Sequence, residues 1–329
     1  MSLRSSSPAL RVLWRIAKTL AAGACIAFVV ARTNLVEVGS ALGRVGSDAL
    51  AVVALLAVSH VAALALRWRA ALRSLGEAPR FLPLLGDLLV GTAYNSVLPS
   101  TVGGDVARAY RCATRAAHPP AALASIALER VVGFLCLAAV PFLGLALGAR
   151  DAPAVFFGVT SAATAVFAIL LVFLHVPLVL LARLVSLLSG RAGAFVAETA
   201  ADLERVRPGG RFAVAGWSLV YQAFSMATFL VVSRSWPEPA PARAVLIGVP
   251  VAMILSALPV TIGGIGLRES LFVAVLGRLG VASGQALLMA AVWGFEWLAL
   301  AIVGAVLVPA TRLSPRETAR PDGSPPARL

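Results

Sequence analysis

The sequence predicts an all-α polytopic membrane protein: an inverted repeat with two re-entrant helical hairpins and about six full spans. Three observations predict this class. The 329 residues are 60% hydrophobic and 13% charged with a mean hydropathy of +0.91, which is outside the usual range of soluble domains. Apolar runs close to the ~20 residues that cross a bilayer recur along the chain. One short motif occurs twice, each time directly after an apolar run.

The apolar runs define the expected elements in order. Full spans are predicted at about 14–31, 49–66, 121–148, 153–174, 211–232 and 285–309. Two further apolar runs, 82–98 and 243–258, lead into the two copies of the motif. Residues 175–189 are apolar but interrupted, which favours the membrane interface, and the charged residues 190–210 are typical of a solvated connector. The proline-containing segment 311–329 is predicted to be a disordered cytoplasmic tail.

The repeated motif relates two halves of one domain over residues 1–310, about 10–150 and 151–310. Residues 98–108 read LPSTVGGDVAR and residues 258–268 read LPVTIGGIGLR, so a shift of 160 positions (258 − 98) aligns them. The shift superimposes the Leu-Pro pair, the threonine, both glycines and the arginine. Gly/Pro breaks at matching points of two hydrophobic halves are the best sequence indication of a transporter binding site.

The distribution of arginine predicts the topology. With a cytoplasmic N-terminus, the segments between spans are clearly positive on the cytoplasmic side and nearly neutral outside. This holds only if 82–118 enters the membrane and returns to the cytoplasm, while 243–283 enters and returns outside. Three full spans separate these hairpins, so they approach from opposite faces and both termini are cytoplasmic. Hairpins that cross completely, giving eight or more spans, remain the alternative.

Composition also argues against other classes. The net charge of +13 comes almost entirely from arginines between apolar runs, where they orient helices and meet anionic headgroups, so no nucleic-acid partner is expected. The three cysteines, Cys25, Cys112 and Cys136, show neither a disulfide framework nor metal-site spacing. We expect no metal and no cofactor. The basic N-terminus resembles a signal peptide but is interpreted as part of a retained first helix.

The motif residues have a definite chemistry. Leu98-Pro99 and Leu258-Pro259 should end the entering half-helices, since proline cannot continue a helix. The glycine pairs that follow permit a tight turn through positive φ. A new half-helix should begin near Asp105 or Ile265, and its free amides form an anion site. Arg108 and Arg268, one turn later, could add bidentate phosphate contacts. The functional hypothesis is two phosphate-binding corners that face each other.

A simpler interpretation stays open for each motif residue. Glycine pairs also allow helices to pack closely in lipid, and Arg108 could be a positive-inside anchor. Thr101 and Thr261 either bind substrate or cap the broken helices. Asp105 suits a helix N-terminus on electrostatic grounds, or binds a headgroup amine or a proton. Glu269 is adjacent to Arg268, and neighbours on a helix face different directions.

Ionisable residues inside the spans form a second set of candidates. Charge within a membrane is costly and marks function by default. Glu129 and Arg130 are neighbours, so each should have its partner on another helix. The acids are Asp87, Glu129 and Glu296, and the arginines are Arg108, Arg130 and Arg268. They form either an internal ion-pair network or a group that couples substrate or protons. His60 is expected to hydrogen-bond between helices.

The combination NSVLPSTVGGDVARAYR, then Glu129-Arg130, then ALPVTIGGIGLRES resembles the membrane domain of lysylphosphatidylglycerol synthases, also found as free-standing flippase-like proteins. The resemblance covers about 10–310. In full-length synthases this domain moves aminoacylated phosphatidylglycerol between leaflets, and a separate soluble domain makes that lipid. The sequence ends at Leu329, so the resemblance implies only the flippase-like part and no synthase activity. It implies site positions at Asn95, Pro99, Gly103, Gly104, Asp105, Arg108, Glu129, Arg130, Pro259, Gly263, Gly264, Arg268 and Glu269.

Three functions follow from these observations, and Thr101, Thr261 and Glu296 join the substrate-binding candidates. The first is a multi-pass translocase of the cytoplasmic membrane that moves an anionic phospholipid or polyprenyl-phosphate lipid. The second is an integral-membrane transferase with a lipid-linked donor, although no HExxH, paired-aspartate or nucleophile motif occurs in the sequence. The third is an accessory subunit without cargo. The sequence leaves a homo-oligomer open.

Overall fold

The computed structural model is entirely helical in the residues that it describes, which are 43, 46–97, 102–147, 153–236, 238–257 and 267–310. The helices are α3 (Ser47–Ser74), α4 (Phe81–Val97), α5 (Val102–Ala113), α6 (Pro120–Ala146), α7 (Ala154–Val172), α8 (His175–Ser186), α9 (Gly190–Arg205), α10 (Pro208–Arg234), η2 (Ala244–Gly248), α11 (Val249–Ser256), α12 (Leu267–Gly277) and α13 (Ser283–Ala310). The span expected at 14–31 and the tail 311–329 lie outside the described residues.

Five described helices, α3, α6, α7, α10 and α13, are long and apolar enough to cross a membrane. They correspond to five of the six full spans that hydropathy predicts. The all-α polytopic class is therefore confirmed. The bounds of α6, α7, α10 and α13 lie within a few residues of the predicted ones, because each helix is delimited by proline or by a change to polar sequence.

Helix α3 is longer than the sequence predicts. Hydropathy ends the span at residue 66, but the helix continues through Arg67 and Trp68 to Ser74. Trp68 is fully buried and Arg67 is only 7% exposed, so this last part of α3 packs inside the protein. Residues 67–74 thus belong to a buried helix although hydropathy predicts that the span ends at residue 66, since a hydropathy profile cannot distinguish a buried arginine from a solvated one.

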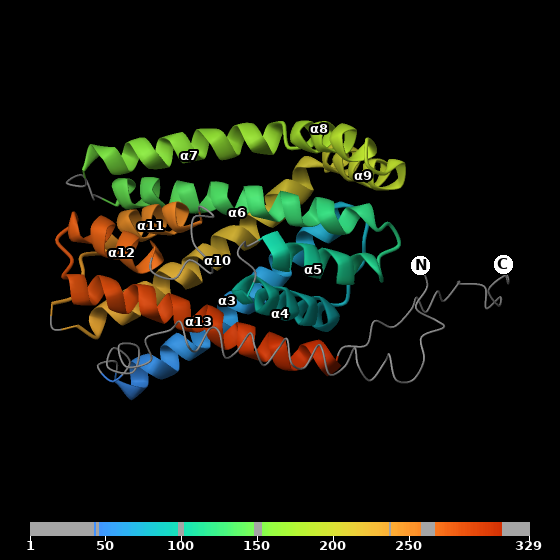
Figure 1. Ribbon diagram of the computed structural model, residues 1–329. Coiled ribbons are helices and arrows are strands. Elements are labelled where there is room, and N and C mark those ends of the chain that lie inside the picture. The colour runs from blue at the N-terminus through green and yellow to red at the C-terminus, as the bar shows by residue number, and fades with distance from the viewer. Residues whose placement is uncertain are drawn as a thin grey trace.

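The two motif-bearing hairpins lie at opposite ends of the bundle. In Figure 1, α4 and α5 pack together at one end, while α11 and α12 pack together at the other. Helix α4 ends at Val97, directly before Leu98-Pro99, as the sequence predicts. Helix α11 ends at Ser256, just before the second copy of the motif. Residues 98–101 and 258–266 lie outside the described residues.

The structure corrects the role expected of the first glycine pair. Helix α5 begins at Val102, so Gly103 and Gly104 lie in its first turn rather than in a turn before it. Among the described glycines, positive φ occurs at Gly76 and Gly280, not at this pair. Gly104 instead allows a close helix crossing, because a Cβ atom there would overlap the Gly91 carbonyl of α4. For Gly104, the close packing that the simpler interpretation expects is observed.

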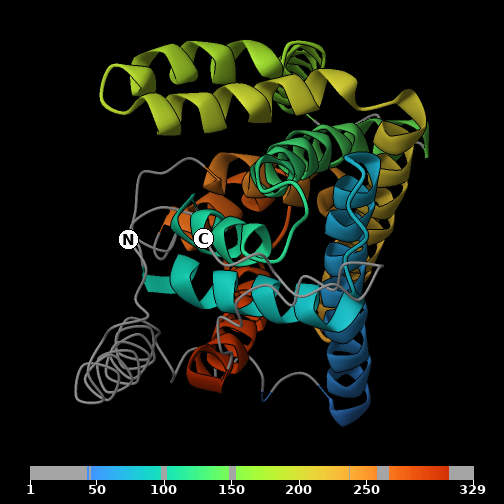
Figure 2. The same ribbon diagram turned by 90° about the vertical axis from the view of Figure 1, so that its right-hand side faces the viewer.

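The shift of 160 that aligns the motifs also aligns the helices around them. It carries 47–74 onto 207–234, where α10 lies, and 120–146 onto 280–306, most of which lies in α13. It likewise carries α4 onto η2 and α11, and α5 onto α12. The packing follows the same correspondence: α4 contacts α5 and α13, while α11 contacts α12 and α6. Figures 1 and 2 show α3 and α10 side by side and running in opposite directions.

The two main apolar clusters each combine residues of both repeats, with Val140 of α6 in the first and Tyr221 of α10 in the second. Phe229, Phe272 and Met289 are among the residues buried between α10, α12 and α13. Trp68, Leu72 and Leu84 are among those buried between α3 and α4. The second repeat also contains the π-helical segment η2. Pro250 has no amide hydrogen, so the carbonyl of Leu246 lacks its α-helical partner at this point.

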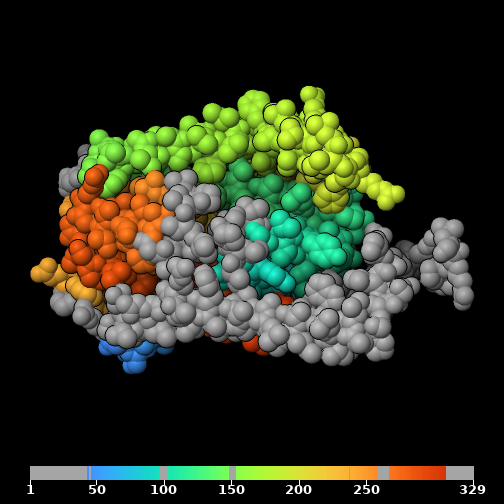
Figure 3. Space-filling view, viewed as in Figure 1, coloured from blue at the N-terminus to red at the C-terminus, as the bar shows by residue number. Residues whose placement is uncertain are grey.

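Helices α7, α8 and α9 separate the two repeats in the sequence. Figure 3 shows them as one layer along a face of the molecule. In Figure 2, α7 is seen end-on, while α8 and α9 extend sideways as a hairpin. Leu184, Leu187 and Leu188 of this hairpin are strongly exposed. Residues 190–205, expected as a connector, form helix α9, which packs on α8.

Candidate functional site

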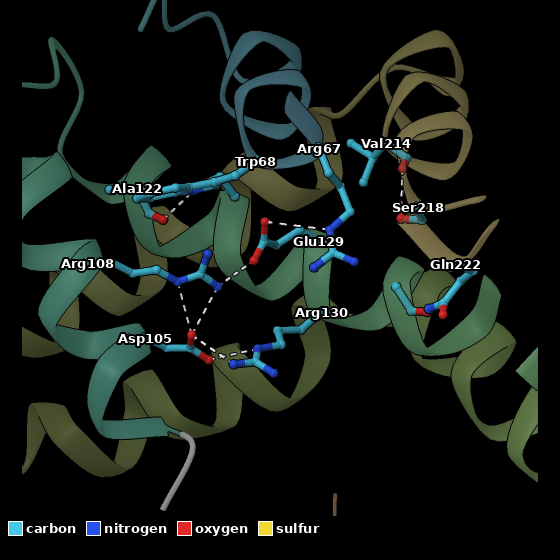
Figure 4. Close-up of polar contacts among 12 residues, drawn as sticks. Arg67, Trp68, Asp105, Arg108, Ala122, Glu129, Arg130, Val214, Ser218 and Gln222 are labelled. Carbon is cyan, nitrogen blue, oxygen red and sulfur yellow. Dashed lines mark hydrogen bonds and ion pairs between the residues drawn. The ribbon is translucent and has the colours of Figure 1, made fainter. Parts of the chain in front are cut away.

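Five charged residues from three helices meet inside the first repeat and form what we call the arginine cluster. Its members are Arg67 on α3, Asp105 and Arg108 on α5, and Glu129 and Arg130 on α6. Figure 4 shows these side chains pointing toward one another. Arg108 is 5% exposed and Glu129 is 1% exposed, so the ion pairs of the cluster are shielded from water. As predicted, neighbours Glu129 and Arg130 both have partners on another helix.

Arg108 lies at the centre of the cluster. Its Nη2 contacts Glu129 Oε1, and its Nε donates to Asp105 Oδ1 at 3.0 Å. The guanidinium also lies over the Trp68 ring, 4.9 Å from the centroid, and Trp68 is fixed by its Nε1–H donating to Ser125 Oγ at 2.9 Å. Arg108 thus already has two carboxylate partners and one aromatic partner, which together offset the cost of its burial.

Arg130 is the most exposed cation of the cluster. Its side chain is 37% exposed and forms a bidentate pair with Asp105, from Nε to Oδ2 at 2.9 Å and from Nη2 to Oδ1 at 3.0 Å. Asp105 therefore accepts from Arg108 and Arg130 at once (Figure 4). The bidentate geometry is the one with which a guanidinium also binds phosphate.

Arg67 is the member that sequence reasoning missed. Its Nε lies 3.9 Å from Glu129 Oε2, and its guanidinium carbon lies 5.1 Å from the centroid of the Tyr221 ring on α10. Arg67 Nε and Glu129 Oε2 are both buried without a hydrogen-bond partner among the described residues. Gly133, four residues after Glu129, leaves the space that Arg67 fills. A glycine one turn beyond an intramembrane acid was the feature of the sequence that could have indicated a buried arginine here.

Asn95 joins the first hairpin to the cluster. Its Oδ1 accepts from the Gly104 amide at 2.7 Å, in the first turn of α5. This contact satisfies one of the amides that the sequence analysis expected to be free for an anion. The acid expected nearby, Asp87, is fully buried but contacts Arg111 and Arg115 of α5 instead of the cluster.

The second repeat places its described candidates differently. Arg268 donates from Nε to Glu269 Oε1 at 2.9 Å, so these neighbours do pair, contrary to the expectation that they face apart. The contact forms at the start of α12, where two long side chains can bend toward each other. Arg268 also lies 5.8 Å from the centroid of the Trp293 ring. The remaining candidates lie outside the described residues; they are Pro99, Thr101, Pro259, Thr261, Gly263 and Gly264.

Glu296 forms a separate buried pair with His60. Its Oε1 contacts Nδ1 of His60, and the two side chains are 9% and 3% exposed. The expected hydrogen bond between helices at His60 is thus confirmed. The His60 ring also packs on Tyr221, with ring centroids 3.9 Å apart. The Tyr221 ring also contacts the guanidinium of Arg67, so Tyr221 connects this pair to the arginine cluster.

The arrangement of guanidinium groups in the cluster is of a kind that binds anions. Three arginines meet two carboxylates in the cluster itself, and the third buried carboxylate nearby, that of Glu296, lies in the His60 pair beside Tyr221. The described residues contain no group of three or more His, Cys, Asp or Glu side chains that could hold a metal ion. A phosphate can replace a carboxylate as the partner of a buried guanidinium, because both present oxygens in the same bidentate geometry.

An all-helical bundle with several apolar spans and a buried arginine cluster defines a multi-pass membrane protein. The family model described as "Lysylphosphatidylglycerol synthase TM region" matches residues 15–304, and the chain belongs to this family. This relates it to membrane proteins of lipid modification or transport. No curated protein and no solved structure matches the chain.

Proposed function

We propose that this protein is a lipid translocase that moves a lipid with a phosphate headgroup between the leaflets of the cytoplasmic membrane, without covalent chemistry. The observation that carries the proposal is the buried arginine cluster, in which Arg130 is partly exposed and shares its carboxylate partner Asp105 with Arg108. A phosphodiester supplies one negative charge and oxygens that match guanidinium geometry. Anionic phospholipids and polyprenyl-phosphate lipids share this chemistry, while their tails remain in the bilayer.

Arg130 is the residue that would meet the headgroup first. It is the most exposed arginine of the cluster, and its present partner Asp105 has a second cation in Arg108. A phosphate can therefore take the place of one carboxylate on Arg130 while Asp105 keeps its contact to Arg108. Such an exchange of partners costs less than adding a charge to an unpaired site. Arg268 beside Trp293 is the corresponding cation in the second repeat.

The relation between the two repeats supplies the route. The helices align under one shift, α3 and α10 run in opposite directions, and the two hairpins lie at opposite ends of the bundle (Figure 1). We take this arrangement to be an inverted repeat. Transporters of this kind expose a central site alternately to each side by rocking one repeat against the other. The arginine cluster would be the site that changes sides.

Lipid movement in reconstituted vesicles tests the proposal. Vesicles with a fluorescent phosphatidylglycerol in both leaflets are treated with dithionite, which quenches only the outer leaflet. With wild-type protein, dithionite should quench more than the half of the fluorescence that starts in the outer leaflet. Arg130→Gln should reduce the rate of this additional quenching at least tenfold. Arg183→Gln is the matched control, because Arg183 is an exposed arginine on α8. Equal rates in wild type and Arg130→Gln would refute the role of the cluster.

A further inference from the structure

The His60–Glu296 pair lies at the midpoint of two spanning helices. His60 is residue 14 of the 28 in α3 (60 − 47 + 1), and Glu296 is residue 14 of the 28 in α13 (296 − 283 + 1). Helix α3 belongs to the first repeat and α13 to the second. Among the ion pairs between residues that the structure describes, this is the one that joins helices of the two repeats.

One nitrogen of this pair has no partner. His60 Nδ1 contacts Glu296, but Nε2 is buried and makes no hydrogen bond within the described part of the chain. A buried imidazole nitrogen without a partner is costly in one fixed state. It is useful, however, as a place where a proton binds and leaves, since histidine changes charge near neutral pH. The Tyr221 ring, 3.9 Å away between centroids, offers a π-face to the protonated imidazolium.

The groups that face the pair come from every helix around it. Tyr221 on α10 packs on His60, and it is within electrostatic reach of Arg67, Glu129, Arg130 and Glu296. Helix α4 packs against α3 and α13, but its acid Asp87 contacts Arg111 and Arg115. Arg268 at the start of α12 contacts Glu269. The pair and the arginine cluster therefore form one connected group of charges around Tyr221.

The charges in this group balance only when His60 is neutral. Arg67, Arg108 and Arg130 carry three positive charges; Asp105, Glu129 and Glu296 carry three negative ones. The empty site is then neutral. A bound phosphodiester would add one negative charge to a buried region, where an uncompensated charge is strongly unfavourable. Protonation of His60 removes that charge, because it converts the Glu296 pair from anionic to neutral overall.

We propose that the His60–Glu296 pair binds one proton together with each anionic headgroup, so that lipid and proton move together. This inference rests on the proposed function and adds the ion that accompanies the lipid. The proton comes from water and binds the free nitrogen of His60, and no other bond changes. Because binding free energies are reciprocal, the anion strengthens proton binding and the proton strengthens anion binding by the same factor.

The sign of the pH dependence follows. Under this proposal the protein that carries the proton binds the anion more tightly, so affinity for the anion is greatest at low pH. The affinity for the anion falls as pH rises from the value at which the empty protein releases the proton to the value at which the anion-bound protein releases it. Within that range, the dissociation constant for an anionic lipid should rise by up to about tenfold per pH unit. A net neutral lipid such as phosphatidylcholine needs no proton and should show no such dependence.

Titration calorimetry of the full chain in detergent measures the coupling. Phosphatidylglycerol is titrated at one pH in two buffers with different ionisation enthalpies, and the difference in heat gives the protons taken up. Wild type should take up about one proton per lipid within the linked range. His60→Gln should bind phosphatidylglycerol without proton uptake and with an affinity independent of pH. The exposed control Arg183→Gln should behave as wild type.

The outcomes separate the two proposals. Phosphatidylglycerol binding by wild type without proton uptake would overturn the proton inference and leave the lipid site intact. Absence of any phosphatidylglycerol binding by wild type would overturn both. Full proton uptake in His60→Gln and in Glu296→Gln, each still folded by size-exclusion chromatography, would also overturn the assignment of the proton to this pair. Loss of uptake in both variants with lipid binding retained supports it.

Discussion

Gly133 stands directly beside the Arg67 guanidinium, and a Cβ atom at position 133 would lie 2.7 Å from Nη1. The glycine is part of α6, one turn beyond Glu129, so the same helix supplies both the carboxylate and the space for its arginine. A buried arginine in a membrane helix needs such room, because its guanidinium cannot reach the headgroups.

Gly133→Ala should displace Arg67 and weaken transport. The added methyl group forces the guanidinium away from Glu129, which loses one of its two cations. We expect at least a tenfold lower rate of lipid movement in the dithionite assay. Gly216→Ala is the matched control, since nothing lies within 4 Å of a Cβ atom there. It should retain the wild-type rate, and an equal loss in both variants would contradict the explanation.

Asn95→Ala should loosen the first hairpin. The substitution removes the acceptor for the Gly104 amide, which is bonded at 2.7 Å in the first turn of α5. Loss of a cap of this kind costs about 1 kcal/mol. Thermal unfolding in detergent should shift downward by a few degrees. Ser96→Ala is the control, because the Ser96 hydroxyl donates to the Thr92 carbonyl within α4.

Cysteine labelling tests the opposite orientation of the hairpins. Ala117 lies in the connection after α5 and Ala282 in the connection before α13; both are exposed and belong to opposite ends of the bundle (Figure 1). In a background without native cysteines, Ala117→Cys and Ala282→Cys should react with an impermeant maleimide from opposite sides of the membrane. Labelling of both from the same side would contradict the inverted repeat. The predicted cytoplasmic N-terminus places Ala117 on the cytoplasmic side.

The sequence was sufficient for the approximate bounds of α6, α7, α10 and α13, and α4 is described up to Val97, directly before Leu98-Pro99. Long apolar runs and a Leu-Pro pair act locally, so their effect does not depend on what packs against them. The duplicated motif also indicated the two hairpins. Family membership followed from the same residues, together with Glu129-Arg130.

Features that depend on packing were not predictable. Arg67 was assigned to a loop because hydropathy treats every arginine as polar, whereas here Gly133 and Tyr221 provide a buried place for it. The glycines of the first motif were expected to form a turn. They lie in α5 instead, because Gly91 on α4 allows a close crossing that only the assembled hairpin reveals. The pairing of Arg268 with Glu269 likewise depends on side-chain torsions.

Substitutions at Arg108 and Glu129 should separate stability from transport. Glu129 is 1% exposed and contacts both Arg108 and Arg67, so Glu129→Leu leaves two buried cations with one partner fewer. Breaking a buried pair from one side costs about 3–5 kcal/mol, and this variant should unfold at a clearly lower temperature.

The double variant Arg108→Met with Glu129→Leu replaces both charges by apolar groups of similar volume. Such replacements are often neutral for stability, so thermal unfolding should recover in part toward that of wild type. The remaining loss reflects Arg67, whose carboxylate partner Glu129 is removed. Arg130 keeps Asp105 as its partner in this background. If Arg108 and Glu129 only hold α5 against α6, lipid movement should recover together with stability. If they form part of the anion site, the folded double variant should remain at least tenfold slower than wild type, and this second result is the one we expect.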